Sequence, residues 1–251
     1  RQRPGWADAH NSAGVALYTQ GRNEDAAKQF AHALAADPAH APAHVNLGNA
    51  LTDLGRLDEA LPHYGRALEI DPHDPTAHLA RAMALEEDGR HDEALEAYRR
   101  AHALAPSDGI RIKIATMLPM YPASTEEIDG LRDRLVQEID ALMAQPLVLR
   151  DPVREVGQTA FLLPYQGRND RELQVRLAAL YEHACPGLAW VAPHCRAPRP
   201  QSSRLRVGFA SRYFTAHSVG IWFNRLIALV AREPDLEVVL IRSEEHTSEL
   251  Q

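Results

Sequence analysis

The stretch Gly89-Arg90-His91-Asp92-Glu93-Ala94-Leu95 decides the fold of this 251-residue chain, because two earlier segments repeat its pattern. Residues 21–27 and 55–61 also open with Gly-Arg, continue to an acidic pair and then alanine, and lie 34 residues apart. A glycine at this place suits the left-handed residue that ends one helix. The acidic pair favours the positive amino-terminal end of the helix that follows. The segments therefore predict three helix–turn–helix units.

Six further columns of residues recur with the same 34-residue period, and each has a packing role. Small residues let paired helices approach closely, leucines and aromatic rings fill the space between layers, and proline stops the second helix. The columns are Gly14/Gly48/Ala82, Leu17/Leu51/Leu85, Ala26/Ala60/Ala94, Phe30/Tyr64/Tyr98, Ala33/Ala67/Ala101 and Pro38/Pro72/Pro106. They resemble the tetratricopeptide repeat (TPR) consensus. The resemblance implies hairpins at 7–40, 41–74 and 75–108, stacked as an α-solenoid over residues 1–108.

The amino-terminal end of this array has its own features. Pro4 lies 34 residues before Pro38, which predicts the tail of an earlier repeat at residues 1–6. Because the first residue is Arg1 and not Met, we expect the array to have been cut there. A solenoid end without a polar cap exposes apolar surface, so the side of the first hairpin that carries Ala13 and Leu17 is expected to be exposed.

His10, His44 and His78 share one column, where the TPR consensus has a large apolar residue. Such a ladder could indicate metal binding or pH sensing. Equivalent positions in successive repeats are expected to lie two helix widths apart, on the order of 15–20 Å. The sequence therefore favours histidines that pack within the repeats.

Charge and cysteine usage limit the classes of partner and cofactor. The net charge of −7 belongs to the repeats, since residues 1–108 carry 17 acidic and 10 basic side chains and residues 109–251 carry 17 of each. This argues against nucleic acid as a partner. No apolar run is long enough to cross a membrane and no leader opens the chain, so we expect a cytoplasmic protein without a membrane partner.

Two cysteines and two histidines form the one candidate metal cluster: His183, Cys185, His194 and Cys195. A zinc site is conceivable with these ligands. The usual Cys-x-x-Cys pairing is missing and Pro186 and Pro193 intervene, so the sequence favours structural residues and no bound metal.

The repeat pattern fails after Asp108, because Thr116, Pro119 and Arg132 fall where small or apolar residues belong. Residues 109–203 are predicted to be a helical connector and linker. Helices are expected at 109–118, 125–144, 152–164 and 169–184, and the leucines and isoleucines of the second and fourth form an apolar stripe on one side. The Pro- and Arg-rich residues 185–203 are expected to be a linker.

A different pattern follows the linker. Residues 205–211 and 236–241 are predicted to be short buried strands, and residues 218–231 an apolar helix between them. This order indicates a β-α-β unit, the opening of a doubly wound parallel sheet. Such sheets bind ligands at the carboxyl ends of their strands, here the loop from Ser211 to His217.

At this point a second resemblance becomes specific. The order of repeats, connector and β-α-β unit, with residues 165–173 (YQGRNDREL), residues 204–209 (RLRVGF) and Ser211…Phe214…His217, resembles bacterial SPINDLY-type O-GlcNAc transferase-like proteins. The resemblance implies that residues 204–241 open the first lobe of a two-lobed, metal-independent glycosyltransferase of the GT-B type. UDP-GlcNAc would be the donor substrate, and its sugar would pass with inversion to Ser or Thr of an acceptor protein.

The same resemblance names the site residues. His217 matches the family's active-site histidine, suited to accept the acceptor proton or to orient acceptor and phosphate; the alternative is a helix-start residue that bonds backbone. Ser211 is a candidate substrate-binding residue and not a nucleophile, since no Gly-x-Ser-x-Gly turn surrounds it. Two positions depart from the family: Tyr213 stands where many members have Asp, and Ile221 replaces a second histidine.

The first helices of TPR repeats line a groove that would hold the acceptor protein or peptide. In O-GlcNAc transferases a ladder of asparagines binds the peptide backbone there. Only Asn46 occupies the corresponding column here, with Ser12 and Ala80 as its neighbours, so Asn46 is the candidate substrate-binding residue and the ladder is incomplete.

The last ten residues, 242–251, resemble the translation of a sequencing-library adapter, so Glu244, Glu245 and His246 are not expected to form a site. Stabilising the leaving diphosphate would need basic groups from a second lobe, which residues 1–241 do not supply. We therefore expect an inactive fragment of a transferase. The alternatives are a non-enzymatic TPR scaffold and a transferase that uses another donor, such as GDP-fucose.

Overall fold

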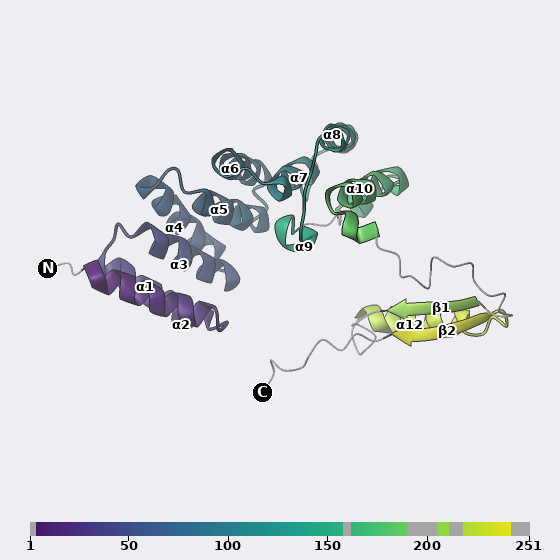
Figure 1. The fold of residues 1–251 in the computed structure, drawn as a ribbon, viewed down its shortest axis with the longest axis horizontal. Coiled ribbons are helices and arrows are strands. Elements are labelled where there is room, and N and C mark those ends of the chain that lie inside the picture. Colours follow the sequence, from purple (N-terminus) through teal and green to yellow (C-terminus); the bar gives the residue numbers. More distant parts are fainter. Residues whose placement is uncertain (1–3, 158–161, 190–204, 211–217, 242–251) are drawn as a thin grey trace. The chain divides into compact units, whose positions relative to one another are not determined.

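A computed structural model of the chain describes residues 4–157, 162–189, 205–210 and 218–241 (Figure 1). The chain divides into two compact units, Arg1–Trp190 and Val191–Gln251. The described residues of the first unit are helical, and those of the second form a pair of strands and one helix.

Six helices at the start of the first unit form three helical hairpins, as the 34-residue period predicts (Figure 1). Within each hairpin the two helices pack against each other, and each hairpin packs on the next. The first helices α1, α3 and α5 also contact one another in sequence. The bounds are α1 Pro4–Tyr18, α2 Asn23–Ala36, α3 Ala41–Asp53, α4 Leu57–Ile70, α5 Pro75–Glu87 and α6 His91–Leu104.

The turn within each hairpin has the predicted chemistry. Gly21, Gly55 and Gly89 have φ angles of 73°, 70° and 77°, a left-handed conformation that favours glycine. An acidic pair lies in the first turn of each helix that follows. Both predictions from the repeated stretch are confirmed.

The small column holds the two helices of a hairpin close together. A Cβ atom at Gly48 would lie 2.6 Å from Cε1 of Tyr64, and one at Gly14 would lie 2.5 Å from the same atom of Phe30. Both rings are buried, with 1% of their surface exposed. In the third hairpin the buried Ala82 takes the equivalent position beside Tyr98. The ring of the second helix thus occupies the space that a side chain on the first would need.

We expect Gly48→Ala to destabilise the first unit by about 1–3 kcal/mol, because the added methyl group forces the Tyr64 ring to move. That movement would also disturb two hydrogen bonds of the Tyr64 hydroxyl, which donates to Asn49 Oδ1 and accepts from the Thr52 hydroxyl. Gly65→Ala is the matched control, since nothing lies within 4 Å of a Cβ there. This control should be neutral or stabilising by up to about 1 kcal/mol through helix propensity. Thermal unfolding measures both, and equal melting temperatures for the two variants would contradict the prediction.

The amino-terminal end differs in part from the prediction. Pro4 is the first residue of α1 and not part of a turn that precedes it. Proline is tolerated there because the first turn of a helix does not use its N–H. On the first hairpin Ala13 is exposed, as predicted, but Leu17 is half-buried and packs with the repeat core.

The connector continues the first unit with shorter elements. Helices predicted at 109–118, 125–144 and 169–184 are confirmed within a few residues. A helix over 152–164 is wrong: α9 stops after one turn, where Gly157 has a left-handed φ of 65°. The bounds are α7 Asp108–Thr116, α8 Thr125–Met143, α9 Pro152–Glu155, η1 Leu163–Gln166, α10 Arg171–Ala184 and η2 Pro186–Ala189.

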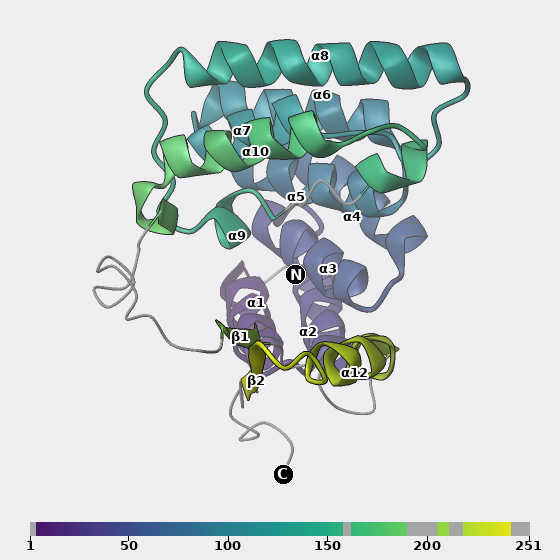
Figure 2. The same ribbon diagram turned by 90° about the vertical axis from the view of Figure 1, so that its right-hand side faces the viewer.

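The connector has its own apolar core. Helix α8 contacts both α7 and α10, and Figure 2 shows the three helices lying alongside one another. The predicted apolar stripes of α8 and α10 face this core. Its buried members from these two helices are Leu135, Ile139, Leu142, Leu173, Leu177, Leu180 and Ala184.

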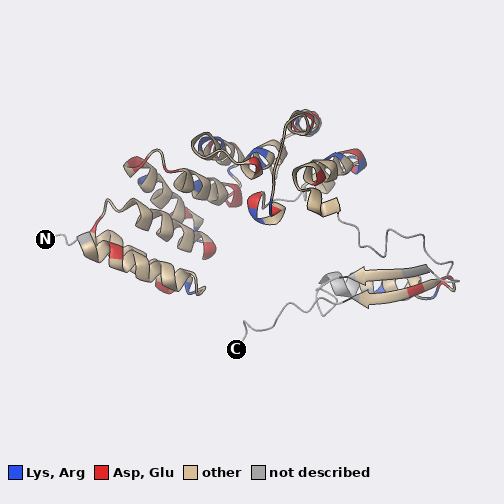
Figure 3. Ribbon diagram, viewed as in Figure 1, with Lys and Arg blue, Asp and Glu red and all other residues tan. Residues whose placement is uncertain are grey.

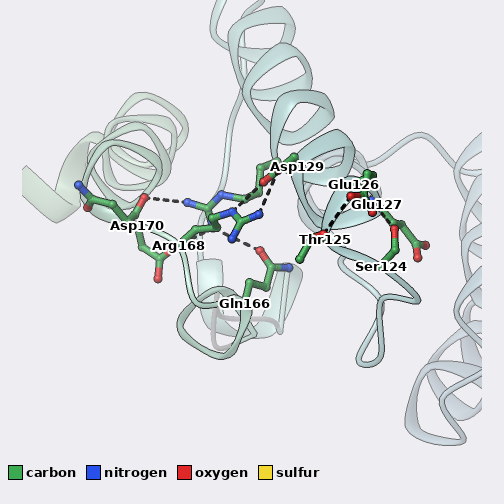
Figure 4. Close-up of polar contacts among 10 residues, drawn as sticks. Ser124, Thr125, Glu126, Glu127, Asp129, Gln166, Arg168 and Asp170 are labelled. Carbon is green, nitrogen blue, oxygen red and sulfur yellow. Dashed lines mark hydrogen bonds and ion pairs between the residues drawn. The ribbon is translucent and has the colours of Figure 1, made fainter.

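The segment 165–173, quoted above for its resemblance, holds α8 to α10. The Arg132 guanidinium of α8 donates to Asp170 Oδ1 at 2.7 Å and to the Asn169 carbonyl at 2.8 Å. It also reaches Gln166 Oε1 at 3.2 Å. Figure 4 shows this set of contacts beside the ion pair of Arg168 with Asp129. Since only 12% of the Arg132 side chain is exposed, the segment has a structural role.

The second unit contains two short parallel strands, with one described helix between them in the sequence. Strand β1 (Leu205–Ala210) pairs in parallel with β2 (Leu236–Ile241), and α12 (Ser218–Val230) connects them. The register joins Val207 to Val238 and continues along both strands. Within the described part of this unit the sheet has two strands, so a GT-B lobe is not shown by the fold.

Candidate functional site

The first helices of the three hairpins present one continuous set of side chains to solvent. Their positions within each helix are spaced by four, three and four residues, which places them on one helix face. All are exposed or half-buried. We call this set the open face; its members are Asp8, Ser12 and Val15 on α1 with Thr19 directly after it, Pro42, Asn46, Asn49 and Asp53 on α3, and Thr76, Ala80, Met83 and Glu87 on α5.

Asn46, the residue predicted from the asparagine ladder, lies near the middle of the open face. Its amide nitrogen donates to Asn11 Oδ1 on α1 at 2.9 Å. This bond fixes the side chain between two repeats. Among the described residues the Asn46 amide oxygen has no further partner, so it is left to accept a hydrogen bond from a ligand.

Asn49, which the sequence analysis missed, lies one helical turn after Asn46. Its Oδ1 accepts a hydrogen bond of 2.9 Å from the Tyr64 hydroxyl, and no described residue binds its NH₂ group. Asn46 and Asn49 therefore offer one acceptor and one donor side by side. Its column carries Val15 and Met83 in the other repeats, so the 34-residue period gives no sign of it.

The open face combines apolar and acidic groups. Met83 has 56% and Val15 40% of its surface exposed. Asp8, Asp53 and Glu87 supply carboxylates, and none of the twelve side chains is Lys or Arg. Figure 3 shows Asp and Glu (red) on the repeat helices.

Two tyrosines lie close to Asp53. Burial and the neighbouring Asp53 carboxylate raise the pKa of Tyr18, on the preceding first helix. Burial raises the pKa of Tyr64 to about 12, and the charges of Asp53 and Glu87 add to the effect. Asp53 and Glu87, which belong to successive repeats, thus both raise the pKa of the buried Tyr64.

The three column histidines pack within the repeats, as the sequence favoured. His44 and His78 each approach a carbonyl oxygen six residues earlier, that of Pro38 or Pro72, at 3.1 Å. His10 lies 2.9 Å from Gln29 Oε1 on the partner helix. The first helices touch, so they lie closer than two helix widths. Each imidazole nevertheless turns to a partner in its own hairpin or the adjoining turn.

His44 and His63 form an unusual pair, with their Nδ1 atoms 3.0 Å apart. The Pro38 carbonyl accepts only, so His44 carries its proton on Nε2 and its Nδ1 accepts from Nδ1–H of His63. Burial lowers the pKa of both imidazoles. Arg66 and His40 lower the pKa of His44 further, and Glu59 opposes the lowering at His63. The pair has no room for protons on both facing nitrogens.

We expect the stability of the chain to fall as the pH drops below about 6.5, the ordinary histidine value. The folded pKa values lie below the unfolded ones, so the unfolded state binds more protons in acid. His63→Gln copies the His10–Gln29 pair of the first hairpin, since an amide can donate or accept. Its melting temperature should match that of the wild type near pH 7.5 and exceed it near pH 5.5. Parallel melting curves for both proteins across this range would contradict the prediction.

The candidate zinc cluster is only partly described. His183 Nε2 lies 2.9 Å from the Gln145 carbonyl oxygen, and Cys185 is a half-buried free thiol. His194 and Cys195 lie outside the described residues. In the part of the chain that the structure describes, no three His, Cys, Asp or Glu side chains converge on a point suited to a metal ion.

One hollow lies where the third hairpin meets the connector. It has a volume of about 480 Å³ between the α5–α6 turn, the α7–α8 loop and α8. Its two arginines have partners within the protein: Arg90 binds Glu93 through two hydrogen bonds of 2.7 Å, and Arg134 donates to the Met117 carbonyl at 2.9 Å. These contacts make the hollow part of the hairpin–connector joint.

The two transferase candidates, Ser211 and His217, lie outside the described residues. Residues 211–217 connect the carboxyl end of β1 to the first residue of α12. Of the predicted site residues, the structure therefore places Asn46 alone.

Comparisons with known proteins agree on the repeats. A tetratricopeptide repeat family model matches residues 11–75 and 45–109, so this part of the chain consists of TPR repeats. None of the curated proteins matches the sequence. No helix within the described ranges combines the length and apolar character needed to cross a bilayer.

Solved structures similar to the chain include three TPR domains. The Arabidopsis OM64 TPR domain is 27% identical over 40% of this chain and 83% of that chain, with a TM-score of 0.39. The first TPR domain of human RPAP3 is 19% identical over 55% and 96%, with a TM-score of 0.41. The yeast Sti1 TPR2B domain, in a complex with pHsp70, is 23% identical over 53% and 97%, with a TM-score of 0.38.

Proposed function

We propose that the repeats of this chain bind an extended segment of another protein on the open face. The observation that carries the proposal is the pair of half-buried amides, Asn46 and Asn49, each held by one bond and each with one polar group left over. An extended peptide backbone offers N–H and C=O groups in alternation, so one acceptor and one donor side by side can bind it.

The surroundings of the two amides support this proposal. Met83 and Val15 flank them with exposed apolar surface, which can pack against peptide side chains. Helix α3 lies between α1 and α5, and seven of its residues are buried. The amides therefore stand on a rigid support, and little side-chain entropy would be lost on binding.

A phage-displayed peptide library tests the proposal. Peptides selected on the wild-type chain should bind an Asn46→Ala, Asn49→Ala double variant about tenfold more weakly, since two hydrogen bonds are lost. Fluorescence anisotropy with the selected peptides measures this change. Gln137→Ala, at an exposed position of α8, is the control and should bind as the wild type does. Selected peptides that bind both variants equally would place the binding site elsewhere.

A second candidate function is that the parent protein transfers GlcNAc from UDP-GlcNAc to Ser or Thr of the segment that the repeats bind. The parallel pairing of β1 with β2, with α12 between them in the sequence, supports it. Units of this kind bind ligands at the carboxyl ends of their strands. The segment that holds Ser211 and His217 follows the carboxyl end of β1. There His217 would take the proton of the acceptor hydroxyl as its oxygen attacks the anomeric carbon of GlcNAc. The bond from that carbon to the diphosphate would break in the same step, and UDP would leave. No metal is required in this scheme.

The product of the full gene tests the second candidate. Transfer of labelled GlcNAc to protein should fall by about 10²–10⁴-fold in His217→Ala, the range for loss of a general base. His183→Ala, which removes a connector histidine, should keep its activity. Labelled GDP-fucose replaces UDP-GlcNAc in a parallel reaction to identify the donor. Unchanged transfer in His217→Ala would remove this residue from the mechanism.

A further inference from the structure

We propose that the segment bound on the open face is a basic one, with Lys or Arg at positions three residues apart, and that it belongs to a separate protein. This inference rests on the proposed peptide-binding function and specifies the chemistry of the partner. It comes from the distribution of carboxylates that lack a cationic partner.

One carboxylate of the acidic pair at each hairpin turn is neutralised within the repeats. Arg22 binds Asp25 at 2.6 Å, and Arg56 and Arg90 bind Glu59 and Glu93 at 2.7 Å. These pairs recur in all three hairpins, at the start of the second helix.

The carboxylates of the open face differ in that none of them has a Lys or Arg partner among the described residues. Asp53 and Glu87 are the last residues of α3 and α5 and occupy one column. Both are exposed, and within the described residues neither forms an ion pair. Asp8 has only His40 as its partner, at 3.0 Å. Since the open face carries no Lys or Arg, its negative charge is available to a cationic ligand.

Lys113 of α7, the cation that pairs with the neighbour of Glu87, already has its partner. Lys113 of α7 forms an ion pair of 3.0 Å with Glu86, and its ammonium group lies 5.3 Å from the Tyr98 ring centre. Glu86 also accepts a hydrogen bond of 2.6 Å from the Tyr98 hydroxyl. The charge of Lys113 is thus paired with Glu86, and Lys113 forms no ion pair with Glu87.

The spacing of the partner's basic residues follows from the packing of the helices. Because α3 and α5 touch, Asp53 and Glu87 are separated by one helix-to-helix distance, on the order of 10 Å. An extended chain advances by about 3.3 Å per residue, so three residues span this distance. The residues between the two cations would lie beside Asn49 and Met83, which precede the two carboxylates by one helical turn, and an apolar side chain fits there.

The test uses three synthetic peptides with the same apolar residues and with Arg, Gln or Glu at the two spaced positions. Anisotropy on the whole chain should give the tightest binding for the Arg peptide and the weakest for the Glu peptide. The double variant Asp53→Asn, Glu87→Gln should weaken the Arg peptide about five- to tenfold, in the range for two exposed ion pairs. It should leave the Gln peptide unchanged. Added salt should reduce the difference between the peptides.

A matched control removes the same charge elsewhere. Glu69→Gln with Glu96→Gln acts on exposed pairs of α4 and α6 and should leave all three affinities unchanged. Equal binding of the Arg and Glu peptides, or equal losses in both double variants, would overturn the charge inference. If the Gln peptide still depends on Asn46 and Asn49 in that case, peptide binding stands and only the basic partner is refuted. If no peptide depends on those amides, the proposed function itself fails.

Discussion

The repeats depend on one steric constraint, which is that a helix must carry glycine or alanine where the ring of its partner helix lies. Gly14 and Gly48 meet this condition against Phe30 and Tyr64. The buried rings then fill the space between the helices, and burial of each ring removes on the order of 150–250 Å² from water. Hairpins of fixed geometry stack in a regular way, so the open face inherits its register from this contact. Binding chemistry on α3 is positioned by packing on its opposite side.

The residues that recur with the 34-residue period were predicted from the sequence, and binding residues without a counterpart in the other repeats were missed. Turn glycines and the small and aromatic columns follow from the 34-residue period, because each position faces the same neighbours in every repeat. Asn49 has no counterpart in the other repeats, and its role depends on the Tyr64 hydroxyl, which only the folded hairpin brings near. The His44–His63 pair was half visible: the column of His44 repeats, while the partner changes from Gln29 to His63.

The connector shows a different limit. Its apolar stripes predicted α8 and α10, yet the segment 165–173 was quoted for a resemblance and its structural work was not foreseen. The polar residues of that segment surround Arg132, which precedes them by more than thirty positions and has no periodic signal. Long-range polar contacts of this kind depend on which helix faces are brought together, and local sequence patterns do not encode that. The residues that would carry transfer chemistry lie in 211–217, outside the described ranges.

The imidazole pair sits in the middle hairpin alone, and this has a consequence for how the array responds to acid. A linear stack of repeats normally opens from its ends, where each terminal unit has one neighbour instead of two. In acid, protonation would weaken the central hairpin, because the facing nitrogens of His44 and His63, 3.0 Å apart, cannot both carry a proton. The hairpin with the lowest free energy of unfolding would then be the central one instead of a terminal one. In acid, the hairpins on either side would then be joined by a less stable central hairpin. Helix α3, which carries both amides, belongs to that hairpin.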